Sequence, residues 1–399
     1  MEKQVATPYF LIEENLLQEN IENLKTGISL FFPQFIIGYS FKTNALPWLI
    51  GKLHAEGFFA EVVSADEYEL ARLLGFPIKQ IIYNGPAKNE ESFIEAVTNG
   101  AIVNLETHRE LRWLESIKQK NLKVGLRIQV DVESYCPGET VNGQLGGRFG
   151  FQLDELPQIL KQLERLEVSL AGIHVHTSSK TRSVNIYHAL ASEAARLIHL
   201  YNWHLTYLDI GGGFFGGVPD KPSFTEYFEV IYQSLASVTY LEELQLIVEP
   251  GASIIASPVS LVTSVIDTKK TPHGYFVTTD GSRTNIDPFF LKTYYEVTFE
   301  RQTTSIAESE LQAFKQKNRQ IISGFTCMEN DQLFVLENQP LFDEGDRIIY
   351  HKVGSYTMCF NPLFIQYLPA VYVKRGNKLT QVRSHWTARE YIQRSEEYK

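Results

Sequence analysis

Short apolar segments alternate with polar, helix-like segments over about residues 35–265. The apolar segments are, in order, "FIIGYS", "GFFAEVVS", "QIIYNG", "AIVNL", "KVGLRIQV", "LAGIHVHT", "LTYLDIGGG" and "LQLIVEPG". Stretches between them, such as "ADEYELARLLGF" and "NEESFIEAVTNG", have helical periodicity and acidic residues in the first turn. A strand-length apolar run followed by an amphipathic helix, repeated in this way, predicts an α/β fold: a TIM-like (β/α)₈ barrel.

The pattern changes after about residue 265 to strands joined by turns. The expected strands lie in "SLVTSVIDTKKTPHGYFVTTDG", "RQIISGFTC", "DQLFVLE", "DRIIYHKVGSY" and "AVYVKRGNKLTQVR". The opening "TPYFLIEENLLQENIENLKTG" supplies a strand that could join these and a helix that leads into the barrel. We therefore predict a barrel domain of residues 30–265, and a β-barrel-like domain of residues 1–29 and 266–399 that contributes to the active site.

Composition excludes several classes of function. The 399 residues carry a formal net charge of −10 and no long basic cluster, so nucleic acid is not the expected partner. No apolar run of about 18 residues occurs, and "MEKQVATPYF" lacks the apolar stretch of a signal peptide, so no membrane association is expected. Three cysteines without a C-x-x-C pair argue against a disulfide framework or a structural zinc site, and for the reducing cytoplasm.

Polar residues gather at the ends of the predicted barrel strands. Active sites of such barrels lie at the carboxyl ends of the strands. The residues in these positions are Lys42, Glu61, Arg127, His174, His176, Gly211, Gly212, Gly213 and Glu249. A series of this length on one rim favours a functional site over chance.

Lys42 follows the first of these strands, in "YSFKTNALPWL". Most lysines at strand ends extend their ammonium group to solvent. A partly buried lysine instead has a lowered pKa and can form a Schiff base with an aldehyde. The apolar surroundings of Lys42 predict that it is partly buried.

Three consecutive glycines, Gly211 to Gly213, follow the strand in "LDIGGGFFGG". Glycines at such a point let the backbone approach a ligand closely, and their N–H groups can bind a phosphate. A flexible turn is the alternative. The spacing does not match a dinucleotide-binding fingerprint.

The histidines of "GIHVHTSSK", His174 and His176, are two residues apart in a strand and so face the same side. A metal site there lacks an obvious third ligand, and we predict none. A flat imidazole could instead stack on an aromatic cofactor, with Ser179 near its phosphate. Glu249 in "VEPGAS" needs a positive or protonated partner, which a pyridinium nitrogen or an arginine would provide.

Taken in order, these motifs resemble the pyridoxal-phosphate-dependent decarboxylases of the alanine-racemase-like fold, the diaminopimelate, ornithine and arginine decarboxylases. The resemblance covers nearly the whole chain. "YSFKTN" is similar to the family's Tyr-x-x-Lys-x-Asn motif, and "EVVSADEYEL", "LRIQV", "HVHTSSK", "GGG" and "EPG" follow it in the family's order. In the β domain, "CMEND" and "GSY" match a catalytic cysteine and a tyrosine, Cys327 and Tyr356; taken alone, they could be a buried thiol and a core tyrosine.

The resemblance implies the cofactor, pyridoxal 5′-phosphate, and a role for each matching residue. Lys42 would bind the cofactor aldehyde covalently, and Glu249 would pair with its ring nitrogen. Cys327 would reach the active site of the other subunit of a homodimer with shared sites. The remaining cofactor-site residues implied are Glu61, Arg127, His176 on the ring face, Ser179, the glycines 211–213 and Tyr356, with Glu67 as an acid that anchors a loop.

The predicted reaction is decarboxylation of an amino acid. The cofactor serves as an electron sink if its ring nitrogen stays protonated, and Cys327 as a thiol could protonate the resulting carbanion. Lys42, Cys327 and His176 are thus the predicted catalytic residues. A racemase of the same fold usually has an arginine at the ring nitrogen, so Glu249 favours decarboxylation.

Three positions depart from the family's motifs. Ala252 replaces an arginine that contacts the phosphate, Met328 replaces an acid after the cysteine, and Ser178 replaces a glycine. A thioether cannot pair with the distal ammonium of a diamino acid, so Glu329, Asp331 or Arg283 would take over recognition of the substrate. The expected substrates are therefore a diaminopimelate- or ornithine-like amino acid, or a modified or carrier-bound one. A racemase and a degenerate homologue that only binds a partner are the alternatives.

Overall fold

A computed structural model of the chain describes residues 5–143, 146–301 and 319–396. The chain forms two compact units, one of residues 19–254 and the other of residues 1–18 with 255–399. Among the described residues, no helix has the length and apolar character needed to cross a membrane.

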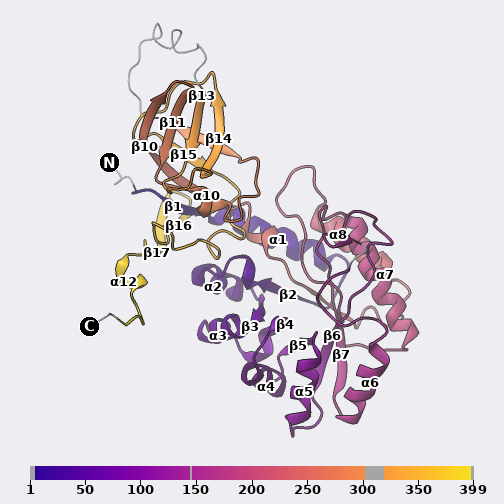
Figure 1. The fold of residues 1–399 in the computed structure, drawn as a ribbon. Helices are drawn as coiled ribbons and strands as arrows, with labels where there is room; N and C mark the ends of the chain where they lie inside the picture. The colour runs from indigo at the N-terminus through magenta and orange to yellow at the C-terminus, as the bar shows by residue number, and fades with distance from the viewer. Residues whose placement is uncertain (1–4, 144–145, 302–318, 397–399) are drawn as a thin grey trace. The chain divides into compact units, whose positions relative to one another are not determined.

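The unit of residues 19–254 is a closed parallel barrel of strands β2 to β9 (Figure 1). The strands are β2 (Phe35–Ser40), β3 (Phe59–Ser64), β4 (Ile81–Ala87), β5 (Ile102–Leu105), β6 (Lys123–Arg127), β7 (Ser169–His174), β8 (Tyr207–Asp209) and β9 (Gln245–Val248). Pairing of β2 with β9 closes the barrel, with Phe35 opposite Leu246. Each strand overlaps one of the eight apolar segments, so the predicted (β/α)₈ barrel is confirmed.

Helices connect the strands on the outside of the barrel (Figure 1). They are α1 (Glu14–Ser29), α2 (Pro47–Ala55), α3 (Ala65–Leu73), α4 (Glu90–Thr98), α5 (His108–Ser116), α6 (Leu156–Arg165), α7 (Val184–Leu200), α8 (Phe224–Ser234) and the short α9 (Ala252–Ile255). Several begin at side-chain caps: Asn89 accepts a hydrogen bond at the start of α4, and Thr107 and Ser223 form capping boxes on α5 and α8. Local sequence thus sets where these helices start.

The second unit is built on strands, as predicted. They are β1 (Tyr9–Glu13), β10 (Val259–Thr271), β11 (Gly274–Thr279), β12 (Val297–Glu300), β13 (Arg319–Ser323), β14 (Gln332–Glu337), β15 (Arg347–Tyr350), β16 (Ala370–Arg375) and β17 (Lys378–Arg383), with the short helices α10 (Arg283–Ile286) and α12 (Ala388–Tyr391). The N-terminal strand β1 pairs with β10 and β16, so it joins this sheet. The pattern of apolar residues did not reveal β12 or α10, each four residues long.

The boundaries between the units differ from those expected at residues 30 and 265. The first lies inside α1 and the second at the end of α9. The second boundary comes earlier because the whole of β10 pairs with strands of the sheet, β1, β11 and β15, and with none of the barrel.

Candidate active site

Lys42 lies on a short 3₁₀ turn, Phe41–Thr43, directly after β2. Its side chain is 43% exposed, and its Nζ donates to Oε2 of Glu61 at 2.9 Å. More than half of the surface of the Lys42 side chain is therefore covered, and its amine is paired with an acid. The strand ends at Ser40, and the turn directs the amine into a cavity of about 1230 Å³ that Arg127 and His176 also line.

Glu61 is the buried partner of this amine. Its carboxylate accepts hydrogen bonds from Ser40 Oγ at 2.5 Å and from Asn84 Nδ2 at 3.1 Å, besides that from Lys42. Burial by itself would raise the pKa of Glu61, but the charge of Lys42 and these hydrogen bonds hold it below its usual value. Glu61 therefore stays ionised beside Lys42.

Glu249, at the end of β9, has the opposite electrostatic environment. Its Oε1 accepts from Asn84 Nδ2 at 2.5 Å, and its Oε2 lies 3.8 Å from Nε2 of His174. Burial, the neighbouring Asp209 and Glu61 raise its pKa well above the usual value. Burial likewise raises the pKa of Asp209 to about 7. Because burial and the neighbouring acids outweigh the charges of Lys42 and Arg127, this pair of acids keeps a proton near neutral pH.

His174 is the last residue of β7, and His176 lies two residues beyond it. Their rings are nearly parallel, with 6.3 Å between the ring centroids. Desolvation and the positive charges of Arg127 and Lys42 lower the pKa of His176 to about 3, so its imidazole is neutral. Both ring nitrogens of His174 and Nδ1 of His176 are buried without a hydrogen-bond partner among the described residues. His174, Asp209 and Glu249 bring one polar atom each within 4.8 Å of the others, a grouping of side chains that the sequence did not reveal.

The glycine loop packs directly against these groups. Gly211 and Gly213 have φ values of +71° and +96°. A Cβ atom on Gly211 would lie 2.6 Å from Nδ1 of His176, and one on Gly212 would lie 2.1 Å from the carbonyl oxygen of Glu249. Only glycine therefore fits this approach of the loop to the imidazole and to the end of β9.

Arg127 and Ser179 complete the predicted residues of the barrel. Arg127 donates to Glu106 at 3.0 Å and lies 4.8 Å from the ring centre of Phe149. Ser179 lies in the loop after His176, where its Oγ accepts from the backbone N–H of Thr181 and Arg182.

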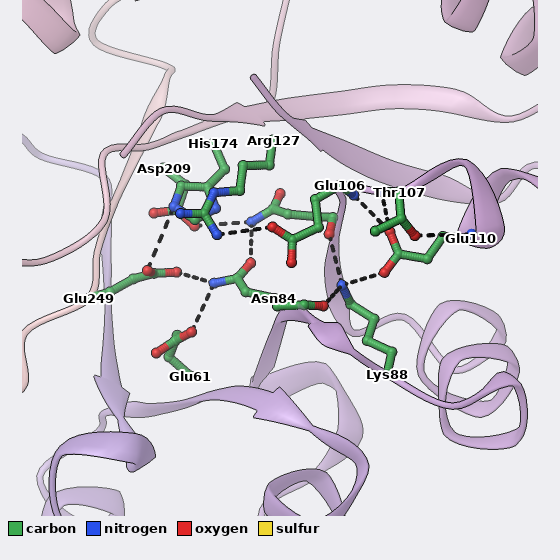
Figure 2. A network of polar contacts seen from close by, with 12 residues as sticks. Glu61, Asn84, Lys88, Glu106, Thr107, Glu110, Arg127, His174, Asp209 and Glu249 are labelled. Carbon is green, nitrogen blue, oxygen red and sulfur yellow. Dashed lines mark hydrogen bonds and ion pairs between the residues drawn. The ribbon is translucent and has the colours of Figure 1, made fainter. Parts of the chain in front are cut away.

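A network of buried polar side chains links the strand ends (Figure 2). Asn84, on β4, donates to both Glu61 and Glu249. Asn104, on β5, donates to Asn84 and to Asp209. Sequence reasoning did not single out Asn84, Asn104 or Asp209. The available signal was an amide or carboxyl group among the apolar residues of "IIYNG", "AIVNL" and "LTYLDI".

The predicted residues of the β unit lie in two loops and a helix. Cys327 and Glu329 are exposed in the loop between β13 and β14, so Cys327 is not a buried thiol. Tyr356 is 39% exposed and is not a core tyrosine. Met328, also in this loop, is half-buried.

Two of the predicted substrate contacts are engaged within the β unit. Asp331 is buried, and its carboxylate accepts from Ser282, Thr326 and the backbone N–H of Arg283. The guanidinium of Arg283 binds Asp287 at 2.9 Å and the carbonyl oxygen of Lys292. We therefore propose that Asp331 positions the loop, while Glu329 stays the predicted substrate contact.

The barrel residues fit pyridoxal phosphate. A primary amine held by a carboxylate lines the cavity, a neutral imidazole packs on a glycine loop, and a buried acid retains a proton. His176 Nδ1 and both nitrogens of His174 are buried polar atoms that a ligand could satisfy.

Comparison with known families gives the same result. Residues 18–256 match a family model described as "Pyridoxal-dependent decarboxylase, pyridoxal binding domain", which spans more than half of the chain. The chain belongs to this family. Pyridoxal phosphate is thus its cofactor, and residues 18–256 cover the whole of the barrel unit of this decarboxylase.

Relatives of this decarboxylase are named diaminopimelate decarboxylase. One from Aquifex aeolicus is 28% identical over 305 residues, covering 73% of this chain and 70% of the relative. One from Bacillus subtilis is 25% identical over 400 residues, covering 94% and 88%.

Solved structures share the fold over nearly the whole chain. The diaminopimelate decarboxylase of M. jannaschii has a TM-score of 0.84 at 21% identity, covering 98% of this chain and 93% of that one. The arginine decarboxylase of Paramecium bursaria Chlorella virus, in a structure with bound agmatine, has a TM-score of 0.75 at 18% identity, covering 93% and 98%.

Proposed function

We propose that this decarboxylase removes the α-carboxyl group of an amino acid related to diaminopimelate, with Lys42, Glu61, His176 and Glu249 engaging the cofactor. The observation that carries the proposal is the pair of differently charged acids in one site. Glu61 is ionised beside a lysine, and Glu249 is held neutral 2.5 Å from an amide. A cofactor with an aldehyde and a basic ring nitrogen needs both kinds of acid. An ionised acid holds the lysine that binds the aldehyde, and a protonated acid can give its proton to the ring nitrogen.

Lys42 is the proposed covalent anchor. Its amine reaches the cavity, and Glu61 fixes its direction at 2.9 Å. The ionised carboxylate holds the amine at the wall of the cavity, where the amine, once it has lost its proton, could attack the aldehyde of the cofactor. The cofactor, once bound, supplies the electron sink that accepts the charge left by departing CO₂.

Glu249 is the proposed partner of the ring nitrogen. It carries a proton when no cation faces it, because burial and Asp209 raise its pKa. A basic nitrogen at this position would receive that proton, and Glu249 would then hold it as an N–H group. His176 would pack on the ring, since a neutral imidazole stacks without adding charge.

Cys327 is the proposed proton donor to the carbon that loses CO₂. Its thiol is exposed in the β unit and so open to a partner. The family resemblance places this cysteine in the site of a second subunit, and we propose a homodimer with shared active sites. Exposed apolar side chains of the β unit support a second copy as partner: Phe289, Leu291, Tyr294, Phe360 and Ile365, which are 46–78% exposed.

The remaining cofactor contacts are proposals of the same kind. Ser179 and the glycine loop would bind the phosphate, with Tyr356 near it and Arg127 at the cavity wall. The site would lie in the cytoplasm, the compartment that suits three cysteines that form no disulfide.

The substrate class follows from the relatives and from Met328. Structures related to this chain are described as complexed with L-lysine, which is diaminopimelate less CO₂, and as bound to agmatine, which is arginine less CO₂. Met328 offers no charge to a distal ammonium, whereas the exposed Glu329 does. We propose that Glu329 recognises the distal amine of a diamino acid. If Glu329 does not have this role, the proposed substrate is a modified or carrier-bound amino acid.

Release of CO₂ from a panel of amino acids tests this proposal. If Glu329 binds the distal ammonium, Glu329→Gln lowers turnover of diaminopimelate or ornithine about ten- to hundredfold, and Met328→Glu gains little. If the loop lacks a distal acid, Met328→Glu instead raises turnover of these diamino acids. Efficient turnover that Glu329→Gln leaves unchanged would contradict this account of the loop. Racemised product without CO₂ would show a racemase, and cofactor binding without any turnover would show a degenerate homologue.

A further inference from the structure

Asn84 occupies a central place among the ionisable groups of the barrel. It is 2% exposed and lies in the middle of β4, with its amide between the carboxyl groups of Glu61 and Glu249 (Figure 2). Its Nδ2 donates to Glu61 at 3.1 Å and to Glu249 at 2.5 Å. A side-chain amide nitrogen has two hydrogens, so each acid receives one of them.

The orientation of this amide is fixed by its neighbours. Asn84 Oδ1 accepts from Nδ2 of Asn104 at 2.9 Å, and the same nitrogen of Asn104 donates to Asp209 at 3.1 Å. Asn104 Oδ1 accepts in turn from the hydroxyl group of Tyr207 at 2.8 Å. Each amide nitrogen thus uses both hydrogens. Reversing either amide would place a carbonyl oxygen against a carboxyl group.

The strands leave room for this chain of hydrogen bonds only at glycine positions. A Cβ atom on Gly125 would lie 2.1 Å from both Asn104 Oδ1 and Tyr207 Oη, and one on Gly172 would lie 2.4 Å from the Tyr207 ring. The strands β4 to β8 therefore fix the direction of this chain of hydrogen bonds. It runs from Tyr207 to Asn104, then to Asn84, and from Asn84 to the two acids.

We propose that Asn84 is a positioning residue: its two N–H groups hold Glu61 and Glu249 as separate acceptors, so that both can carry charge at once. This inference rests on the proposed function, in which Glu61 faces Lys42 and Glu249 faces the ring nitrogen of the cofactor. Two buried carboxylates this close repel each other, and each is stabilised by a hydrogen-bond donor between them.

The electrostatics of the acids agree with this arrangement. The hydrogen bond from Asn84 is one of the contributions that lower the pKa of Glu61, and the charge of Glu61 is one of those that raise the pKa of Glu249. Burial and two acids raise the pKa of Tyr207 well above its usual value, so its hydroxyl group remains a donor.

The test compares two cofactors. Pyridoxal phosphate has a ring nitrogen, and its 1-deaza analogue has a carbon in that position. The wild-type protein should bind pyridoxal phosphate the more tightly, because only this cofactor can pair with Glu249. Asn84→Leu should reduce that preference about tenfold or more, the loss expected for one hydrogen bond to a charged group. Dissociation constants follow from titration of the protein stripped of cofactor.

Two tyrosine variants keep the test decisive if Asn84→Leu does not fold. Tyr207→Phe removes the first donor of the chain and should reduce the preference in the same direction by a smaller factor. Tyr83→Phe is the matched control, since Tyr83 is an equally buried tyrosine whose hydroxyl contacts Ser92 at 2.8 Å and not the chain. It should leave the preference unchanged.

The outcomes separate this inference from the proposed function. Equal loss of affinity for both cofactors in Asn84→Leu would mean that the residue is only structural, and would overturn the inference. A preference that neither Asn84→Leu nor Tyr207→Phe alters would also overturn it. A wild-type protein with no preference would instead contradict the proposed role of Glu249, on which the inference rests.

Discussion

Glutamates at neighbouring positions of the barrel differ in charge because their environments differ. The charge of Lys42 and three hydrogen bonds, one of them from Lys42 itself, keep Glu61 ionised, whereas burial beside other acids keeps Glu249 neutral. Glu67, which accepts a hydrogen bond from the backbone N–H of Val63, has a pKa raised by burial to about 7. The sequence identifies acids near strand ends, but the proton on each depends on contacts between residues far apart in the chain.

Glu67→Gln should change how stability depends on pH. The pKa of Glu67 is about 7 in the folded protein and near its usual value of 4.5 in the unfolded chain. Between these values only the folded state holds the proton. The contribution of Glu67 to stability is therefore greatest below about pH 4.5 and is lost as pH rises to 7, by up to about 1.4 kcal/mol per pH unit.

Urea unfolding of both proteins at pH 5, 6 and 7 measures this effect. The free energy of unfolding of the wild type should fall relative to that of Glu67→Gln as pH rises, since glutamine keeps an acceptor for Val63 and no titrating group. Glu69→Gln, at an exposed position of the same helix, is the control and should follow the wild type. Parallel curves for wild type and Glu67→Gln would show that Glu67 ionises alike in both states.

The strands of the barrel follow directly from the apolar pattern, because each is a short apolar run before an amphipathic helix. The pattern does not show which side chains turn inward. Tyr207 of β8 is packed in the barrel with Ile36, Ile82 and Ile247, and its hydroxyl group begins the chain of hydrogen bonds to the acids. Nothing in the local sequence of β6 and β7 shows that their glycines make room for a tyrosine from another strand.

Gly125→Ala and Gly172→Ala should each destabilise the barrel by about 1–3 kcal/mol, since a methyl group there overpacks the interior. Tyr207→Phe should relieve part of the cost at Gly125, where the added Cβ meets the hydroxyl oxygen. It should relieve none of the cost at Gly172, where the Cβ meets the ring itself.

Double-mutant cycles on the free energy of unfolding measure both couplings. Gly51→Ala is the control, because no atom lies within 4 Å of an added Cβ at this position of α2. If Tyr207→Phe reduced the loss of stability equally at both glycines, the described packing of Tyr207 against Gly125 and Gly172 would be contradicted.

At the scale of the molecule, the succession of eight strand–helix repeats and a run of strands predicted the two kinds of unit. The order of motifs predicted the family. The boundaries and the strand β12 were not predicted, because they depend on which strands pair across the sheet. The roles assigned to Cys327 and Tyr356 stay predictions. Both residues belong to the β unit, and only the sequence motifs suggest that they act at the cofactor site.

Complementation tests the proposed shared site. Lys42→Ala and Cys327→Ala should each be inactive. If Lys42 of one subunit works with Cys327 of the other, a mixture of the two variants after subunit exchange should regain CO₂ release, because each heterodimer holds one site with both residues. A mixture that stays inactive, although heterodimers are demonstrated by differential tagging, would contradict shared sites.

The central claim is that Lys42 binds the cofactor through its amine. Reduction of the cofactor-loaded protein with borohydride, followed by digestion and mass spectrometry, locates the attachment directly. The account predicts one phosphopyridoxyl group, on the peptide that contains Lys42, and loss of both this label and the visible absorption band in Lys42→Ala. A label on another lysine, such as the buried Lys88, or a protein that takes up no cofactor, would contradict it.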